Sequence, residues 1–330
     1  MNGLVSERLA NQKLSPSKLR RAVDVVRWFG AVQAQDFNAA KWALALRMRK
    51  ATDATIEEAF NKGEILRTHL LRPTWHFVAP EDIRWLLQLT APRVNLKAGS
   101  GYRQFELDAA VFKRSNKIFM KALQGGKHLT RSALKSLLNA DGIDVTDGVR
   151  LAHILLRAEL DGVICSGPRI GKQFTYALLE ERAPAGKTFN RDEALAELTR
   201  RYFRSHGPAT VQDFVWWSGL TVDDAKRGIA QVGIPRSTGT KQSSAHLLPA
   251  FDEYFVAYKD RQVAAGPLST WDVLGPTFIV DGIAAGKWKR TNSGAIELNS
   301  SRSLKKSEKV AFEEASDRYT TYLGDISRRR

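Results

Sequence analysis

Two glutamines stand one residue apart in the segment Gln33-Ala34-Gln35, and their spacing makes them the first candidates for chemistry. If this segment is extended, both side chains point to one face, because alternate residues of a strand share a face. A pair of amides can orient a water molecule or hydrogen-bond the edge of a base. We therefore predict Gln33 and Gln35 as catalytic residues. The alternative is a polar corner after a helix, with no chemistry.

The elements on either side of this corner predict a winged helix. Ser15-Pro16 is a typical helix start, since Ser caps the helix and Pro suits its first position, and the apolar stripe that follows ends at Phe29. Two more helices and a pair of strands come next, so residues 1–100 form the first unit. The predicted helices are 15–29, 39–48, 53–63 and 80–91, the last ending before Pro92, and the predicted strands are 65–68 and 75–78.

The turn between these two strands is the first predicted DNA contact. Pro73 lacks an N–H and fixes φ, which suits a rigid turn, and Arg72 can meet a phosphate or enter the minor groove. We predict that Arg72, Thr74 and His76 contact DNA. For His76 the alternative is a hydrogen-bonded structural histidine.

A second winged helix is predicted for residues 101–183, with a basic wing. Asp147 caps the helix at 148–160, and the strands that follow it flank a glycine-rich turn. We predict that Arg169, Lys172 and Gln173 on this turn contact DNA, although a solvated turn carries such residues too. The predicted helices are 108–123, 131–138 and 148–160, and the strands are 163–165 and 174–179.

Residues 187–240 predict a third winged helix, and residues 241–330 a small β-rich, barrel-like domain. The third unit has helices at 191–205, 211–217 and 222–232. In the last unit Asp281-Gly282 is a hairpin signal. The expected fold class is therefore α+β, with three tandem winged helices and a β-rich domain. That domain has strands at 277–280, 284–289 and 295–298 and a closing helix at 304–323.

Charge and composition narrow the class of partner. The formal net charge of +16 favours a polyanion, and nucleic acid is the commonest inside cells. A lone cysteine and six scattered histidines offer no zinc-ligand spacing, and 282–287 is one residue short of a phosphate loop. We expect no metal, no cofactor and no membrane span, and a monomer in the cytoplasm, associated with the nucleoid.

Two other functions stay open at this point. A winged-helix transcription regulator would bind DNA without catalysis, but regulators usually dimerise on palindromes. Three dissimilar winged helices in one chain favour an asymmetric clamp instead. An RNA-binding or crosslink-sensing protein is the third interpretation.

The Gln-Ala-Gln corner and the block RPTWHFVAPEDIRWLL resemble the AlkZ-like family of winged-helix DNA glycosylases. So do GPATVQDFVWWSGLT, LLPAFDEYFVAYKDR and FIVDGIAAGKWKR, and the likeness runs from Arg20 to Leu323. It implies a C-shaped arrangement of the winged helices. It also implies removal of alkylated, N7-linked purines and interstrand crosslinks from double-stranded DNA, without metal or cofactor. The family's signature of glutamine, aliphatic residue and glutamine maps to Gln33, Ala34 and Gln35; another branch carries aspartate in the last place.

Overall fold

The first unit has the strand and helix order of a winged helix. The computed structural model describes residues 3–14, 19–183, 185–186, 188–234 and 244–324. Asp36 caps α3, Thr52 and Thr55 form a capping box on α4, and Gly63 ends α4 in the left-handed conformation. The antiparallel sheet has the order β1-β3-β2. The elements are α2 (Ala22–Phe29), β1 (Val32–Gln33), α3 (Phe37–Leu46), α4 (Asp53–Lys62), β2 (Leu66–Leu70) and β3 (Thr74–Val78).

The start of α2 differs from the prediction. Ser15-Pro16 lies outside the described residues, and the helix begins only at Ala22. Leu19 instead makes a parallel bridge with Met48. The apolar residues that were predicted to form one helix therefore begin in extended chain at Leu19 and enter the helix only at Ala22.

The second unit repeats the order of the first, and a long helix connects them. α5 (Ile83–Gln104) runs through Pro92, so the predicted end before this residue is wrong. Pro92 is exposed, while Leu89 and Val94 on either side of it are buried, so packing holds the helix across the missing hydrogen bond. The sheet order is β4-β6-β5. The elements are α6 (Ala109–Leu123), β4 (Leu129–Thr130), α7 (Arg131–Ala140), α8 (Gly148–Leu160), β5 (Ile164–Ser166) and β6 (Thr175–Leu178), followed by α9 (Leu179–Arg182).

The third unit has three helices, capped by Asn190, Thr210 and Thr221. They are α10 (Arg191–His206), α11 (Val211–Ser218) and α12 (Val222–Val232). The expected wing would follow at 235–243, which lies outside the described residues. The first described strand after α12 is β7 (Ala245–Leu248), and it pairs with β8 in the C-terminal sheet.

The C-terminal sheet is antiparallel and open, with the order β10-β9-β8-β7. The described strands do not close into a barrel. Asp281 and Gly282 make the predicted hairpin turn with φ values of 51° and 79°. Neither α1 (Gly3–Asn11) nor β7 was predicted from the sequence. The remaining elements are α13 (Glu253–Val256), α14 (Gln262–Ala265), the short 3-10 helix η1 (Asp272–Leu274), β8 (Thr277–Val280), β9 (Ile283–Arg290), β10 (Ile296–Ser300) and α15 (Lys306–Tyr322).

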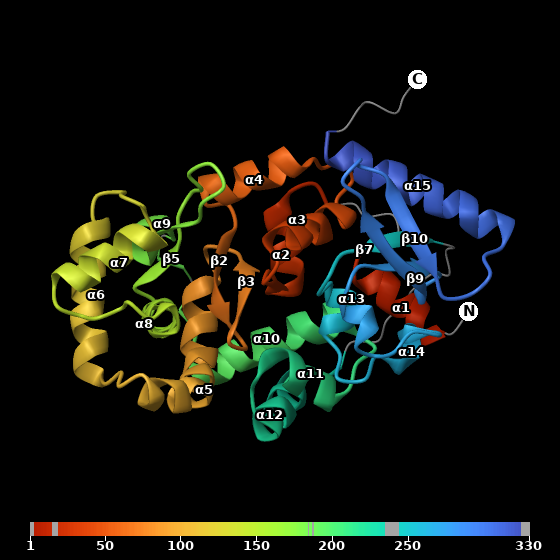
Figure 1. Cartoon of the computed structure of the whole chain (residues 1–330). Coiled ribbons are helices and arrows are strands. Elements are labelled where there is room, and N and C mark those ends of the chain that lie inside the picture. The colour runs from red at the N-terminus through yellow and green to blue at the C-terminus, as the bar shows by residue number, and fades with distance from the viewer. Residues whose placement is uncertain (1–2, 15–18, 184, 187, 235–243, 325–330) are drawn as a thin grey trace.

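Two of the hydrophobic cores are shared between units. One core joins Phe37, Phe60 and Phe77 of the first unit to Phe278 and Trp288 of the C-terminal sheet. In Figure 1 the first unit lies between the second unit on the left and the C-terminal sheet on the right. We therefore propose that the four units predicted from the sequence are parts of one body. No helix in the described ranges is both long and apolar enough to cross a membrane.

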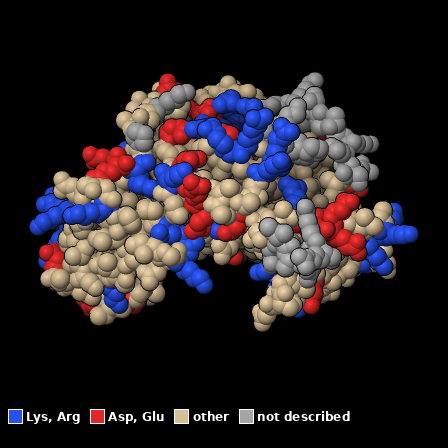
Figure 2. All heavy atoms as spheres, turned by 90° about the horizontal axis from the view of Figure 1, so that it is seen from above, with Lys and Arg blue, Asp and Glu red and all other residues tan. Residues whose placement is uncertain are grey.

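The surface has two lobes with a hollow between them. Figure 2 shows this outline from above, with Lys and Arg side chains over the middle of the face and on the lobes, and Asp and Glu among them. The outline agrees with a C-shaped arrangement.

Candidate active site at the glutamine corner

Gln33 is the last residue of β1 and is only 8% exposed. Its Oε1 accepts a hydrogen bond of 2.6 Å from Arg72 Nη2, on the turn between β2 and β3. A guanidinium has only donors, so this contact requires the oxygen of the Gln33 amide to face Arg72. The amide nitrogen and one lone pair of the oxygen remain for other partners. Arg72 thus fixes the orientation of the Gln33 amide.

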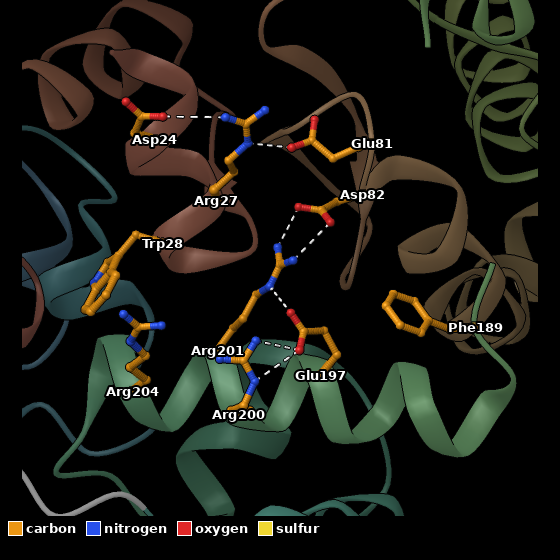
Figure 3. Close-up of a pocket in the computed structure, with 10 residues that line it drawn as sticks. All are labelled: Asp24, Arg27, Trp28, Glu81, Asp82, Phe189, Glu197, Arg200, Arg201 and Arg204. Carbon is orange, nitrogen blue, oxygen red and sulfur yellow. Dashed lines mark hydrogen bonds and ion pairs between the residues drawn. The ribbon is translucent and has the colours of Figure 1, made fainter. Parts of the chain in front are cut away.

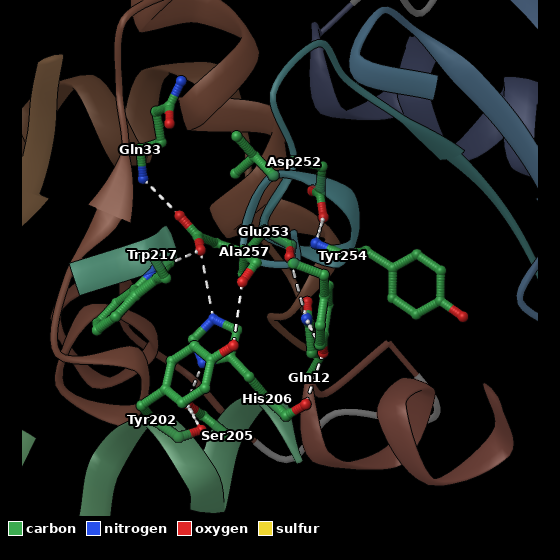
Figure 4. A network of polar contacts seen from close by, with 12 residues as sticks. Gln12, Gln33, Tyr202, Ser205, His206, Trp217, Asp252, Glu253, Tyr254 and Ala257 are labelled. Carbon is green, nitrogen blue, oxygen red and sulfur yellow. Dashed lines mark hydrogen bonds and ion pairs between the residues drawn. The ribbon is translucent and has the colours of Figure 1, made fainter. Parts of the chain in front are cut away.

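A buried carboxylate holds the backbone of Gln33. Glu253 Oε1 accepts a hydrogen bond of 2.7 Å from the Gln33 N–H. Its Oε2 lies 3.0 Å from Trp217 Nε1 and 3.3 Å from His206 Nε2 (Figure 4). Burial alone would raise the pKa of Glu253, but its hydrogen bonds with His206 and the Gln33 N–H hold it below the ordinary value. The corner therefore rests on an ionised group that is satisfied by three N–H donors.

Gln35 has very different surroundings. It is exposed, and its Oε1 accepts one long hydrogen bond of 3.4 Å from the N–H of Trp75. The backbone is held by Arg67, whose Nε donates to the Ala34 carbonyl at 2.9 Å. The two amides predicted as a pair therefore differ: one is fixed and mostly buried, and the other is open to solvent.

His76 and Thr74 belong to β3, the strand that pairs with Gln33. His76 pairs with Gln33 across the β1–β3 register and is fully buried. Its Nδ1 lies 2.9 Å from the Thr74 carbonyl, so the donating nitrogen is Nδ1. Burial and the charge of Arg72 lower the pKa of His76 to about 3, and the ring is neutral. Among the buried polar atoms without a hydrogen-bond partner in the described part of the chain, three lie at this corner: His76 Nε2, Thr74 Oγ1 and Arg72 Nε.

These positions change the roles that we propose for the first turn. His76 has no exposed surface, which argues against direct contact with a phosphate, and Arg72 is half-buried and bonded to Gln33. We propose that both residues act by positioning the glutamine corner. Their unpartnered polar atoms are of the kind that ordered water satisfies in proteins.

The three predicted DNA-binding residues on the wing of the second unit have different surroundings. Arg169 pairs with Glu57 of α4 at 2.8 Å, donates to the Lys172 carbonyl at 2.8 Å and lies against Phe37 and Phe174. It joins the wing to the first unit. Lys172 and Gln173 are exposed. They remain the candidates for contact with DNA.

Lys172 and Gln173 also line a cleft of about 560 Å³. Arg67 and Trp75 form part of its wall, and the register places them on the face of the β1-β3-β2 sheet opposite Gln33. Arg67 lies 4.2 Å from the Trp75 ring and 4.8 Å from the Phe174 ring, and burial lowers its pKa to about 10. The cleft thus adjoins the corner but does not contain Gln33.

A cavity of about 630 Å³ lies elsewhere, between α2, the start of α5 and α10. Figure 3 shows that most of its charged side chains are paired: Arg201 bonds Asp82 at 2.5 Å and Glu197 at 2.7 Å, and Arg27 bonds Glu81. Such pairing is typical of a helix interface and leaves few charged groups free to bind a ligand. In the described residues there is also no group of His, Cys, Asp and Glu that could hold a metal ion.

Comparisons with known proteins identify the family and the fold. A family model described as "DNA glycosylase AlkZ-like" matches residues 26–322. An "Interstrand DNA cross-link repair glycosylase" of Streptomyces sahachiroi is 27% identical over 224 residues, which are 64% of this chain and 59% of that protein. The solved structure of Streptomyces sahachiroi DNA glycosylase AlkZ matches with a TM-score of 0.82 and 21% identity, and covers 97% of this chain and 96% of that chain. This likeness confirms the predicted fold class.

Proposed function

Because the chain belongs to the AlkZ-like family of DNA glycosylases, we propose that it hydrolyses the N-glycosidic bond of alkylated purines in double-stranded DNA. The observation that carries this proposal is the corner itself. One neutral amide is fixed by Arg72 and Glu253, and a second, Gln35, is open to solvent two residues away. The relative from Streptomyces sahachiroi, which is named for crosslink repair, is the reason to include crosslinked purines among the substrates.

Neutral amides suit an N7-alkylated purine as substrate. Alkylation at N7 places a positive charge on the base, which is then a good leaving group without a strong general acid. The remaining task is to hold a water molecule near C1′ of a sugar that becomes cationic. An amide oxygen can accept a hydrogen bond from this water and orient it.

The contacts of the two glutamines support a division of labour. The Gln33 oxygen already accepts a hydrogen bond from Arg72, whereas the Gln35 amide is exposed. We therefore assign the direct contact with the attacking water to Gln35. Gln33 supplies a second hydrogen bond from a fixed position, and Arg72 and Glu253 position it.

We further propose a monofunctional enzyme, in which water alone attacks the sugar. An enzyme that also cleaves the strand uses an amine nucleophile. The side-chain contacts of Gln33 and Gln35 within the described ranges are with Arg72 and the Trp75 backbone, and they include no lysine. Lys172 and Gln173 are the proposed contacts with the DNA backbone, and the protein is proposed to act as a monomer on the nucleoid.

The decisive experiment is incubation with a duplex that contains one N7-methylguanine, followed by measurement of the released base. We expect N7-methylguanine and an abasic site, with no strand break before alkali treatment. If the duplex is bound but no base is released, the proposal fails and the regulator becomes the better interpretation.

A further inference from the structure

Two tryptophans outside the glutamine corner are unusually open to solvent. Trp271, which precedes η1, is 71% exposed, and Trp216 of α11 is 37% exposed. Exposed aromatic side chains that gather in one place mark binding surfaces more often than scattered ones do. Neither residue takes part in the mechanism proposed above.

Arginines connect these two tryptophans to Gln33. Arg261 lies 5.2 Å from the Trp216 ring and 6.0 Å from the Trp271 ring. On the other side, Arg72 lies 5.9 Å from the Trp216 ring and bonds Gln33 at 2.6 Å. We call Arg72, Trp216, Arg261 and Trp271 the tryptophan row. It runs outward from the corner to the surface.

Two members of the row are held in place by hydrogen bonds to backbone carbonyls. Arg261 is only 5% exposed, and its Nε donates to the Phe255 carbonyl at 2.9 Å. Trp216 Nε1 donates to the Val256 carbonyl at 3.0 Å. A fixed aromatic ring loses little conformational freedom when a ligand stacks on it.

A glycine brings α11 close to the turn that carries Arg72. Gly219 ends α11 with φ at +70°, and a Cβ at this position would lie 2.3 Å from the Leu71 carbonyl oxygen. Any side chain here would push α11 away from the turn, and Trp216 with it. The distance between Trp216 and Arg72 therefore depends on this close approach.

We propose that Trp216 and Trp271, the two exposed rings of the tryptophan row, form a stacking platform for unstacked bases of the DNA strand under repair. The inference rests on the proposed function and names how the substrate is held beside the corner. Base–aromatic stacking accepts every base, since every base has a π face, and neighbouring arginines add cation–π attraction. A protein partner is disfavoured because two of the four residues are cations and the whole chain carries a net charge of +16.

The first test measures affinity for the N7-methylguanine duplex. Trp271→Leu should raise Kd roughly ten-fold, in the range of one lost stacking contact, while the slope of log K against log salt stays unchanged because tryptophan is neutral. Trp271→Phe should keep most of the affinity. Leu96→Ala is the matched control, since Leu96 is 70% exposed on α5 and outside the row. Equal Kd values for Trp271→Leu and Leu96→Ala would overturn the proposal.

The second test locates the stacked base. Duplexes with 5-iodouracil at successive positions around the modified purine are irradiated in the complex, and the cross-linked peptides are identified. We expect cross-links to Trp271 at one or two adjacent positions. No cross-link to Trp271 or Trp216 in a saturated complex contradicts the platform. Base release by the parent protein is measured alongside: release without cross-links rejects the platform alone, and cross-links without release reject only the proposed chemistry.

Discussion

At the scale of single residues, the two glutamines give the sharpest prediction. Gln33→Ala and Gln35→Ala should each lower the rate of base release by roughly 10- to 1000-fold, the range for one lost polar group in a transition state. The double variant should lose less than the product of the two, because both amides serve one water. Single-turnover release of N7-methylguanine measures this. Affinity for an undamaged duplex is the control and should barely change, since amides release no counterions. Parent rates in both variants would leave the corner without a catalytic role.

Arg72 should behave as a positioning residue. Arg72→Lys keeps the charge but replaces the planar fork by a compact ammonium that cannot hold the Gln33 oxygen in the same way. We expect the rate at saturating DNA to fall by about ten-fold or more, with little change in Kd. Lys172→Ala should show the reverse, weaker binding with the saturated rate kept. A change in Kd alone for Arg72→Lys would place Arg72 at the DNA instead.

At the scale of elements, we expect two residues of the second wing to have different roles: Arg169 in stability and Lys172 in DNA binding. Arg169→Ala should lower the melting temperature, because it removes the contact with Glu57 and the packing on Phe37 and Phe174. Lys172→Ala should leave the melting temperature unchanged and reduce the salt slope by about 0.9, the share of one phosphate contact. Thermal unfolding and salt titrations of both variants decide between these roles. A parent salt slope in Lys172→Ala would remove the wing from the DNA contact.

β7 carries a second histidine whose burial has a consequence for pH. Burial lowers the pKa of His246 to about 3, as it does for His76. Both rings are neutral in the folded state, whereas an unfolded histidine binds a proton near pH 6.5. Below pH 6.5 the unfolded state therefore binds more protons, and the free energy of unfolding falls, by about 2 kcal/mol per histidine between pH 6.5 and 5.

Denaturant unfolding at pH 7 and pH 5 tests this expectation. His246→Leu should lose less stability on acidification than the parent does, by about the contribution of one histidine. Its two ring nitrogens have no hydrogen-bond partner in the described residues, so leucine leaves no partner unsatisfied. An identical loss in both proteins would show that His246 does not control the acid sensitivity.

Local signals predicted most of these elements, and long-range contacts explain what was missed. Asp147 caps α8 as predicted, and α12 begins at the predicted residue, Val222. Pro92 misled the prediction for α5, because packing outweighed a local helix breaker. The glutamines were predicted from their spacing. Glu253 was not, since its only signal is an acidic residue in an apolar run, and its contact with Gln33 joins residues 220 positions apart.

At the scale of the whole molecule, charge should govern binding. With a net charge of +16 and Lys and Arg side chains over the middle of the face and on both lobes in Figure 2, affinity for undamaged duplex should fall steeply with salt. Each neutralised phosphate contributes about −0.9 to the slope of log K against log salt, and sequence should matter little. Titrations of several unrelated duplexes at increasing salt test this expectation. A flat response, or tight binding to one palindrome only, would contradict it.

The contact between Gln33 and Glu253 also has a consequence for folding during translation. The ribosome releases Gln33 early, but the carboxylate that holds its N–H is made 220 residues later. His206, which shares that carboxylate, also follows Gln33 in the order of synthesis. During translation the corner therefore stays unfinished until most of the chain has emerged. A product cut short before residue 253 would carry both glutamines and the first two winged helices, but would lack the support that holds Gln33. Such a chain would also lack the C-terminal half of the core that the first unit shares with β8 and β9, and it should release no base.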